Sequence, residues 1–385
     1  MLIVNGKIYT MESSPIECGY IQVKDNKIAS LGSMSELPED LHHENIIDVD
    51  GAWILPGLIE SHAHIGITEE KYGVIADDSN EETTPITPTL RAIDAVNPMD
   101  PAFHDAIEAG ITSVMTGPGS ANVVGGQFVF MKTHGRCVDE MIVKNPAAMK
   151  IALGENPKVA YGNQNQCPST RMGTAALLRK TLYQAKQYKR SKEDGTLTKE
   201  EFEMEPWIPV LNREIPLKAH AHRADDILTA IRIAKEFDVD ITIDHGTESH
   251  LIVDEIVKAN VPVIVGTGLT ARSKQEVQYM SFKTNHILQD AGVLCAITTD
   301  HPVALIQYLP ICAGLAVKHG LSMEAGLEAI TINPARICRV DERVGSLKVG
   351  KDADIAIFSG NPMEIFTKTL YTIIDGEIVY ANAEG

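Results

Sequence analysis

The sequence lacks several patterns that mark specialised classes of protein. None of its 6 cysteines stands at the C-x-x-C spacing of zinc or redox motifs, so we expect reduced thiols in or near the core. No run reaches the ~18 apolar residues that a membrane-spanning helix needs. The start, MLIVNGKIYTMESS, has no basic stretch followed by a long apolar one. These absences predict a soluble cytoplasmic protein with no membrane partner.

Basic residues are also scarce. Lys and Arg total 34 against 52 for Asp and Glu, which gives a formal net charge of −18. Because such a surface repels phosphate backbones and anionic lipids, we expect no nucleic-acid partner. The chain has 385 residues and is 44% hydrophobic, enough for one large core or for one large and one small domain.

Strand patterns occupy both ends of the chain. Residues 1–55 and 340–385 carry apolar residues at alternate positions, separated by Asn-Gly, Asp-Asn and Asp-Gly turn signals, which predicts hairpins. Because the two patterns share this texture, we expect them to form one small β-sandwich domain. The main domain, residues 56–339, is then inserted between its two halves.

The middle of the chain repeats strand, loop and helix. The intervening segments mostly carry helical patterns, such as the apolar stripe within residues 224–237. Eight parallel strands that alternate with helices predict an α/β fold of the (β/α)8 or TIM barrel type. The predicted strands are 57–65, 110–117, 127–133, 147–155, 215–222, 239–246, 261–268 and 293–300.

Two segments exceed a minimal barrel, residues 66–100 and residues 156–214. The second contains a predicted long helix, 174–194, with Thr174 as its N-cap. Because both segments follow strands, we expect them at the carboxyl end of the barrel, where barrel enzymes bind small-molecule substrates. Surface decoration or an oligomer contact is the alternative interpretation.

Two histidines stand together on the first barrel strand. In a strand, residues two apart point to the same face, so His62 and His64 both project into the barrel near its mouth. Two neutral imidazoles gain little from each other in an apolar interior, but they make a pair of metal ligands. A satisfied core histidine is the alternative for either residue.

Similar side chains end three other strands. The fifth strand ends with His220 and His222, the sixth with His245, and the eighth with Asp300. Packing alone does not readily explain why such side chains occur at the same end of four different strands. Imidazole nitrogen and carboxylate oxygen are ligands of Zn²⁺, Mn²⁺ and Fe²⁺, so this pattern predicts a divalent metal site.

These residues resemble a known family. The H-x-H after LPGLIE, with His220, His245 and Asp300, is similar to the amidohydrolase superfamily of metal-dependent hydrolases, closest to its imidazolonepropionase-like and prolidase-like branch. The likeness covers nearly the whole chain, including GKIYT and GSLKVGKDADIAIF. It implies that His62 and His64 hold one metal and that His220 and His245 contact a metal. It also implies that Asp300 binds metal and moves protons.

The fourth strand departs from the family pattern. Many members with two metals place a carboxylated lysine at the end of this strand. By strand alternation Lys150 faces away from Glu155, so we expect that Lys150 does not reach the site. Glu155 is predicted as a metal ligand instead, with Lys158 as the second choice, and a cap on the Asn-Pro turn is the alternative role of Glu155.

Four further residues are candidates for contact with a substrate. His222 competes with His220 for the fifth-strand ligand position, and the resemblance favours His220. His222 is then assigned to substrate binding and catalysis, with Arg223, His301 and Gln127 as further substrate contacts. The Gly-rich TGPGSANVVGGQ is not followed by a P-loop lysine, so it does not predict a nucleotide site.

The predicted reaction is hydrolysis of an amide C–N bond in a cyclic amide, an N-acyl amino acid or a dipeptide. One or two divalent ions, Zn²⁺ before Mn²⁺ or Fe²⁺, would lower the pKa of a bound water toward about 7. Asp300 would take up its proton and pass it to the leaving nitrogen. Alternatives are a lactone or phosphotriester hydrolase, and a heterocycle deaminase, although Arg223 replaces the deaminases' Glu. A scaffold without activity is the alternative of another class, and a homo-oligomer is plausible for the family.

Overall fold

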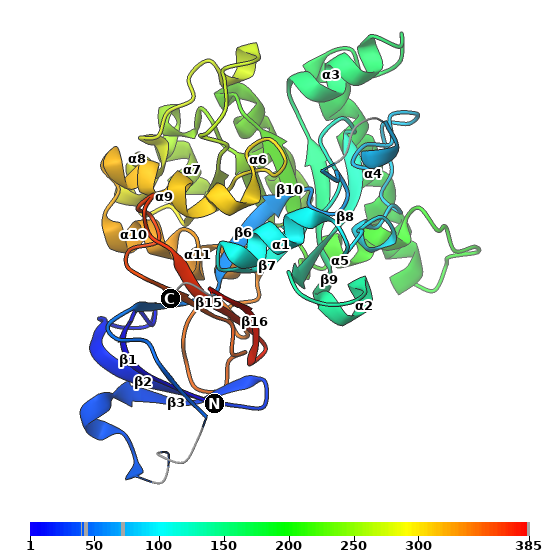
Figure 1. Cartoon of the computed structure of the whole chain (residues 1–385). Helices are drawn as coiled ribbons and strands as arrows, with labels where there is room; N and C mark the ends of the chain where they lie inside the picture. The colour runs from blue at the N-terminus through cyan, green and yellow to red at the C-terminus, as the bar shows by residue number, and fades with distance from the viewer. Residues whose placement is uncertain (40, 42–44, 71–73, 383–385) are drawn as a thin grey trace.

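The computed structural model describes residues 1–39, 41, 45–70 and 74–382, which form two sheets and the helices around them (Figure 1). The larger sheet has 8 strands in the order β13-β12-β11-β10-β9-β8-β7-β6. Its end strands, β13 and β6, also lie in contact, so the sheet is a nearly closed barrel and the predicted α/β fold is confirmed. The strands are β6 (Leu58–Ala63), β7 (Ile111–Thr116), β8 (Val124–Lys132), β9 (Ile142–Ala152), β10 (Leu217–Ala221), β11 (Ile241–His245), β12 (Val263–Val265) and β13 (Cys295–Ile297).

Strand β8 runs against its neighbours. It pairs antiparallel with β7 and with β9, whereas the other neighbouring strands in this sheet pair in parallel. The prediction of eight parallel strands is therefore wrong for β8. The reason is the short connection, residues 117–123, because a parallel crossover needs about a dozen residues or more. Strand β8 consequently starts at the carboxyl end of the barrel.

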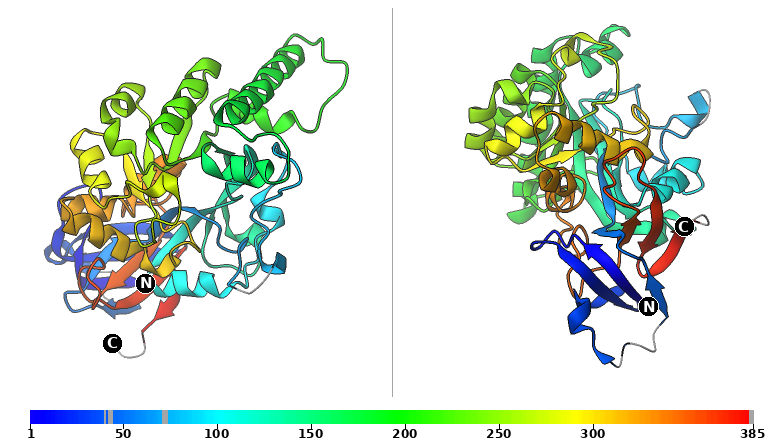
Figure 2. Two further views of the ribbon diagram at one scale, coloured as in Figure 1. Left: turned by 90° about the horizontal axis from the view of Figure 1, so that it is seen from above. Right: turned by 60° about the vertical axis from the view of Figure 1, so that its left-hand side comes forward.

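Helices cover the outside of the barrel (Figure 2). Helix α6 (Ala224–Phe237) has the predicted bounds and buries Ile227, Ala230 and Ile233 in the apolar cluster that includes β10 and β11. The spacing of these residues places them on one face of the helix, which explains why it packs on the sheet. The other α-helices of the barrel are α1 (Pro101–Glu108), α2 (Val138–Met141), α7 (Val253–Ala259), α8 (Thr284–Asp290), α9 (Leu309–Lys318), α10 (Met323–Glu328) and α11 (Ile332–Cys338).

The insertion after β9 contains the long helix α4 (Arg171–Glu193), which extends away from the barrel in Figure 2. Its N-cap is Thr170, whose hydroxyl accepts a hydrogen bond from the Gly173 N–H at 3.0 Å. The prediction of Thr174 as the N-cap is wrong, because the helix has already begun there and Thr174 is buried in its first turn. The insertion also contains α3 (Glu155–Gly162), η5 (Glu205–Trp207) and α5 (Ile208–Leu211).

The second sheet joins the two ends of the chain. Its order is β16-β15-β14-β5-β1-β2-β3, with β4 paired to β1. The hairpins β2–β3 and β15–β16 are confirmed, but β4 and β5 both pair in parallel with β1, so that segment is not the predicted hairpin. The strands are β1 (Leu2–Ile8), β2 (Ile16–Lys24), β3 (Lys27–Ser33), β4 (Ile46–Asp48), β5 (Trp53–Pro56), β14 (Ile355–Phe358), β15 (Thr369–Ile374) and β16 (Glu377–Ala381).

The sandwich form of this smaller part stays a prediction, as do the domain bounds 1–55 with 340–385 and 56–339.

Among the described residues, none of the helices combines the length and the apolar character that crossing a bilayer requires. Short 3-10 helices complete the description: η1 (Met34–Glu36), η3 (Val74–Ala76), η4 (Ala92–Asp94), η6 (Ser249–Leu251), η7 (Gln275–Val277) and η8 (Ile306–Tyr308).

Candidate metal centre

The first group of candidate ligands lies where β6 approaches β13. The Nε2 atoms of His62 and His64 each lie 3.3 Å from Oδ1 of Asp300. His62 is buried, and the other two residues are partly exposed. Asp300 has a φ of 53°, a left-handed conformation that is uncommon outside glycine and is often found at functional positions. The loop after β13 thus turns this carboxylate toward both imidazoles.

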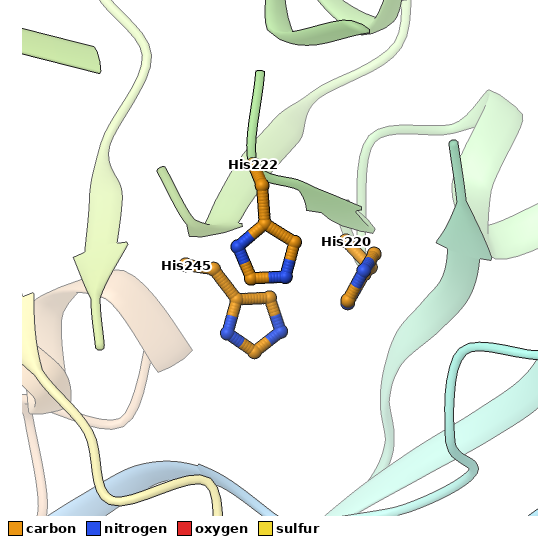
Figure 3. A group of neighbouring side chains, drawn as sticks. All are labelled: His220, His222 and His245. Atoms are coloured by element: carbon orange, nitrogen blue, oxygen red, sulfur yellow. The ribbon is translucent and has the colours of Figure 1, made fainter. Parts of the chain in front are cut away.

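The second group consists of His220 on β10, His222 directly after this strand and His245 at the end of β11. All three are buried, and their rings gather around one point (Figure 3). The ring centroids are 4.5 to 4.7 Å apart. The φ of His245 is 73°, so the strand turns at this residue and its ring meets those of His220 and His222.

The two groups adjoin one another. The ring centroids of His62 and His245 are 5.2 Å apart, and Nδ1 of His245 lies 4.0 Å from Oδ2 of Asp300. Six side chains from four strands therefore meet at the carboxyl end of the barrel, as the strand-end pattern predicts. Five of them are the residues of the family resemblance, and the sixth is His222.

Burial favours the neutral form of four imidazoles in this cluster, those of His62, His220, His222 and His245. Burial lowers the pKa of His62, His220 and His245 well below the ordinary value of 6.5, and neighbouring imidazole and ammonium groups add to the effect. Burial likewise lowers the pKa of His222 to about 3. Neutral imidazole keeps a nitrogen lone pair, which is the form that binds metal ions.

Hydrogen bonds at the other ring nitrogen fix the tautomers of two histidines. Nδ1 of His64 lies 2.7 Å from the Gly117 carbonyl oxygen, and Nδ1 of His245 lies 3.1 Å from that of Gly266. A carbonyl oxygen only accepts, so Nδ1 carries the hydrogen in both rings. Nε2 then has its lone pair free, the usual arrangement of metal-binding histidines.

The donor set fits a divalent cation. Nε2 of His62 and Oδ1 of Asp300 are buried and make no hydrogen bond within the described part of the chain. Buried polar atoms without a partner are rare in folded proteins, and a bound ion can satisfy them. Neutral imidazoles together with a carboxylate are typical ligands of zinc and of neighbouring transition metals.

A layer of buried charge lies beneath the histidines. One carboxylate oxygen of Asp244 lies 3.3 Å from His62 Nδ1 and 3.5 Å from Lys150 Nζ, and the other lies 2.9 Å from Lys218 Nζ. All four side chains are buried. Asp244 therefore lies next to His62 on the side away from Asp300, and two ammonium groups surround its carboxylate.

Lys150 corrects an expectation from the sequence. Its ammonium group lies inside the barrel, 5.5 Å from the centre of the Phe128 ring, and burial lowers its pKa to about 8. The prediction that it faces away from the interior is wrong. Strand β9 ends at Ala152 and Gly154 has a φ of 87°, so the alternation of a strand does not continue from Lys150 to Glu155.

The structure does not bring Glu155 into either group of histidines. Glu155 is the first residue of α3 and is partly exposed, and its backbone N–H donates to Oε2 of Glu276 at 3.0 Å. Lys158 lies one turn further along α3, and its role as a ligand stays a prediction. A carboxylate that the sequence analysis missed stands near them instead. Oε1 of Glu276 lies 3.8 Å from Nε2 of His220 and of His222.

The other predicted substrate contacts make bonds within the protein. Arg223 pairs with Asp225 at the start of α6, with N–O distances of 2.9 and 3.0 Å. His301 is fully buried, and its Nδ1 accepts a hydrogen bond from the Ile306 N–H at 3.2 Å. The Gln127 amide donates to a backbone carbonyl of the first insertion at 3.0 Å. A substrate-binding role for these three residues stays a prediction.

A nearly closed barrel with histidines ending three strands and an aspartate after a fourth defines the class of metal-dependent barrel hydrolases. Residues 176–380 match the family model described as "Amidohydrolase family", and the chain belongs to this family.

Particular relatives agree with this assignment. The solved structure of an amidohydrolase from Thermotoga maritima MSB8 is 40% identical, covers 99% of this chain and 100% of its own, and superposes with a TM-score of 0.94. The amidohydrolase TasK of Hapsidospora irregularis is 28% identical over 94% of this chain, and an adenine deaminase of Listeria monocytogenes is 24% identical over 99%. The chain spans 39% and 57% of the lengths of these two relatives.

Proposed function

We propose that the chain is a metal-dependent hydrolase that cleaves an amide C–N bond with activated water. The observation that supports this most is the convergence of His62, His64, His220, His245 and Asp300 at one end of the barrel. Cyclic amides, N-acyl amino acids and dipeptides are the proposed substrates, because each offers an uncharged carbonyl next to a nitrogen that can leave.

We assign the metal ligands by position. His62, His64 and Asp300 would hold one ion, and His220 and His245 would contact a second where two are bound. Zn²⁺ is the proposed ion, with Mn²⁺ or Fe²⁺ as alternatives. When bound, the ion supplies an acidic water and polarises the substrate carbonyl. A further ligand from Glu155, with Lys158 as the second choice, stays a prediction.

The side chains then divide the remaining work. The Asp300 carboxylate accepts the proton that the attacking water loses and returns it to the leaving nitrogen. Asp244, 3.3 Å from Nδ1 of His62, is proposed to orient the His62 ring. His222, the sixth member of the cluster, is proposed to contact the substrate, and Arg223, Gln127 and His301 are weaker candidates for that role.

A heterocycle deaminase is the second candidate, because the similarity to the adenine deaminase extends over 99% of this chain. Ammonia release from purine and pyrimidine bases would distinguish it from an amide hydrolase. Lactones and phosphotriesters can be attacked at the same kind of site.

The alternative of another class is a scaffold protein without activity. Such a protein would not need five candidate metal ligands at one end of the barrel. Cytoplasmic location and a homo-oligomeric state are also proposals.

Two measurements test this function: the metal content of the purified chain, and the activity of the wild type compared with that of one variant. We expect the purified chain to contain one or two transition-metal ions and to hydrolyse members of an amide and dipeptide panel. Asp300→Asn should lower kcat by roughly 10²- to 10⁴-fold, the usual contribution of a general acid or base. Asp290→Asn, on the exposed surface of α8, serves as the control and should have wild-type activity. A chain without bound metal, or an active Asp300→Asn variant, would contradict the proposal.

A further inference from the structure

A carboxylate reaches the second histidine group from an unexpected element. Glu276 belongs to η7, in the long loop between β12 and α8, and only 1% of its surface is exposed. Its Oε1 lies 3.8 Å from Nε2 of His220 and 3.8 Å from Nε2 of His222. It thus faces two imidazoles that burial keeps neutral.

Both oxygens of this carboxylate are held by the protein. Oε2 accepts the Glu155 N–H at 3.0 Å, and Oε1 lies 2.6 Å from the Lys274 ammonium group. Lys274 in turn donates to Oδ1 of Asn156 at 2.8 Å. Asn156 lies beside the same site, with its amide nitrogen 3.4 Å from Nε2 of His220. These bonds fix Glu276 in one orientation, as metal-binding carboxylates usually are.

The backbone of the neighbouring turn leaves room for Glu276. Gly154 has a φ of 87°, and a Cβ atom there would lie 2.8 Å from Oε2 of Glu276 and 3.1 Å from an Asp226 oxygen. A side chain at Gly154 would therefore force the Glu276 carboxylate or the turn itself to shift. The turn between β9 and α3 and the loop after β12 therefore approach each other closely at Gly154 and Glu276.

We infer that Glu276 is a ligand of a metal ion that His220 and His222 bind. Ligand atoms about 2.0 to 2.2 Å from a tetrahedral zinc ion are separated by about 3.4 Å. The distance of 3.8 Å from Oε1 to each imidazole nitrogen is close to that value. Two neutral imidazoles and one carboxylate then offer three donors to this ion, and the carboxylate halves the charge of the dication.

This inference rests on one part of the proposed function, namely that the histidine cluster binds metal. It assigns His222 to the metal as well as to the neighbourhood of the substrate. It also gives a role to the loop after β12, because none of the ligands predicted at the strand ends lies in that loop. Lys274 is then a positioning residue, which holds the carboxylate without touching the ion.

The experiment measures metal affinity instead of activity. The full chain is stripped with a chelator and titrated with Zn²⁺ against a competing chelator, and Co²⁺ absorption reports the coordination. We expect Glu276→Gln to weaken one bound ion by tenfold or more and to change the Co²⁺ spectrum, while the other ion is unaffected. Glu248→Gln is the matched control, because Glu248 is also buried and also accepts one backbone N–H, from Ala224 at 2.8 Å. Its affinity and spectrum should equal those of the wild type.

Two outcomes separate this inference from the proposed function. If Glu276→Gln binds both ions as tightly as the wild type does, the inference fails and the proposed function stands. If the wild type binds no ion, both fail. Should Glu276→Gln not fold, a crystal of the metal-loaded wild type decides. Anomalous density about 2.0 to 2.2 Å from a Glu276 oxygen supports the inference, and a separation beyond bonding reach overturns it.

Discussion

The buried histidines make the metal-free chain sensitive to acid. The folded pKa of His62, His220, His222 and His245 lies below 6.5, chiefly because of burial, so these rings stay neutral while the unfolded chain takes up protons below that value. Each such ring lowers the free energy of unfolding by about 1.4 kcal/mol per pH unit. The loss starts as the pH falls through about 6.5, and for His222 it continues to about 3.

We therefore predict that the melting temperature of chelator-treated protein falls steeply between pH 7 and pH 5. Calorimetry or circular dichroism at several pH values measures this. His222→Gln should make the dependence shallower, because one titrating ring is removed. His104→Asn is the control, since His104 is exposed on α1. A melting temperature that does not change over this interval would show that the rings are protonated in the folded chain.

Glu60 holds the two edges of the barrel together at the first ligand group. It is buried on β6 and accepts hydrogen bonds from the Thr298 hydroxyl at 2.6 Å, from the Thr299 N–H at 2.8 Å and from the His62 N–H at 3.0 Å. We predict that Glu60→Ala lowers the free energy of unfolding by roughly 3 kcal/mol, because several buried donors lose their acceptor.

Urea denaturation measures this effect, and Glu60→Gln should cost less because one acceptor oxygen remains. Metal affinity should fall as well, because Thr298 also accepts the Asp300 N–H at 2.9 Å. Unchanged stability of Glu60→Ala would show that water replaces the carboxylate.

The ligand residues could be predicted because their positions follow from a simple rule. Parallel strands bring their carboxyl ends together, so His62, His220, His245 and Asp300 had to lie near one another once the strands were recognised. Glu276 could not be found in this way, because its place depends on the path of a long loop. Lys150 was misplaced because the alternation of a strand was extended through a glycine with positive φ.

At the scale of the element, the start of α4 makes a direct test. Thr170 is exposed and caps the helix through a bond to the Gly173 N–H at 3.0 Å. We predict that Thr170→Ala lowers the free energy of unfolding by about 1 kcal/mol, the usual value of an N-cap. Thr170→Ser keeps the oxygen and should be close to the wild type in urea denaturation. Equal stability of all three chains would mean that the end of α4 frays without cost.

The strands themselves were easier to predict than their directions. Apolar alternation marks a strand but is the same when read in either direction, so nothing in residues 127–133 shows that β8 runs antiparallel. The length of the preceding loop carried that information. The N-cap of α4 was missed for a related reason, because Thr170 and Thr174 are equally good capping residues and only the packing of Thr174 decides between them.

At the scale of the whole molecule, the sheet formed by the chain ends is tied to the barrel by buried charge. Lys132, the last residue of β8, is 3% exposed, and its Nζ lies 3.1 Å from Oδ2 of Asp352. It also pairs with Asp354, just before β14. Asp352 has Arg343 as a further partner, at 2.7 Å. The sequence predicted that the two ends meet, but a buried ion pair between residues so far apart in the chain leaves no local pattern.

Removal of Lys132 should destabilise the whole chain. Lys132→Met leaves Asp354 buried without its cation, and breaking a buried ion pair by removing one partner costs about 3 to 5 kcal/mol. The double variant Lys132→Met with Asp354→Asn should recover part of this loss, because the uncompensated charge is gone. Lys235→Met, on the exposed side of α6, is the control and should be neutral. If Lys132→Met were as stable in urea as this control, the junction between the two sheets would depend on its apolar contacts alone.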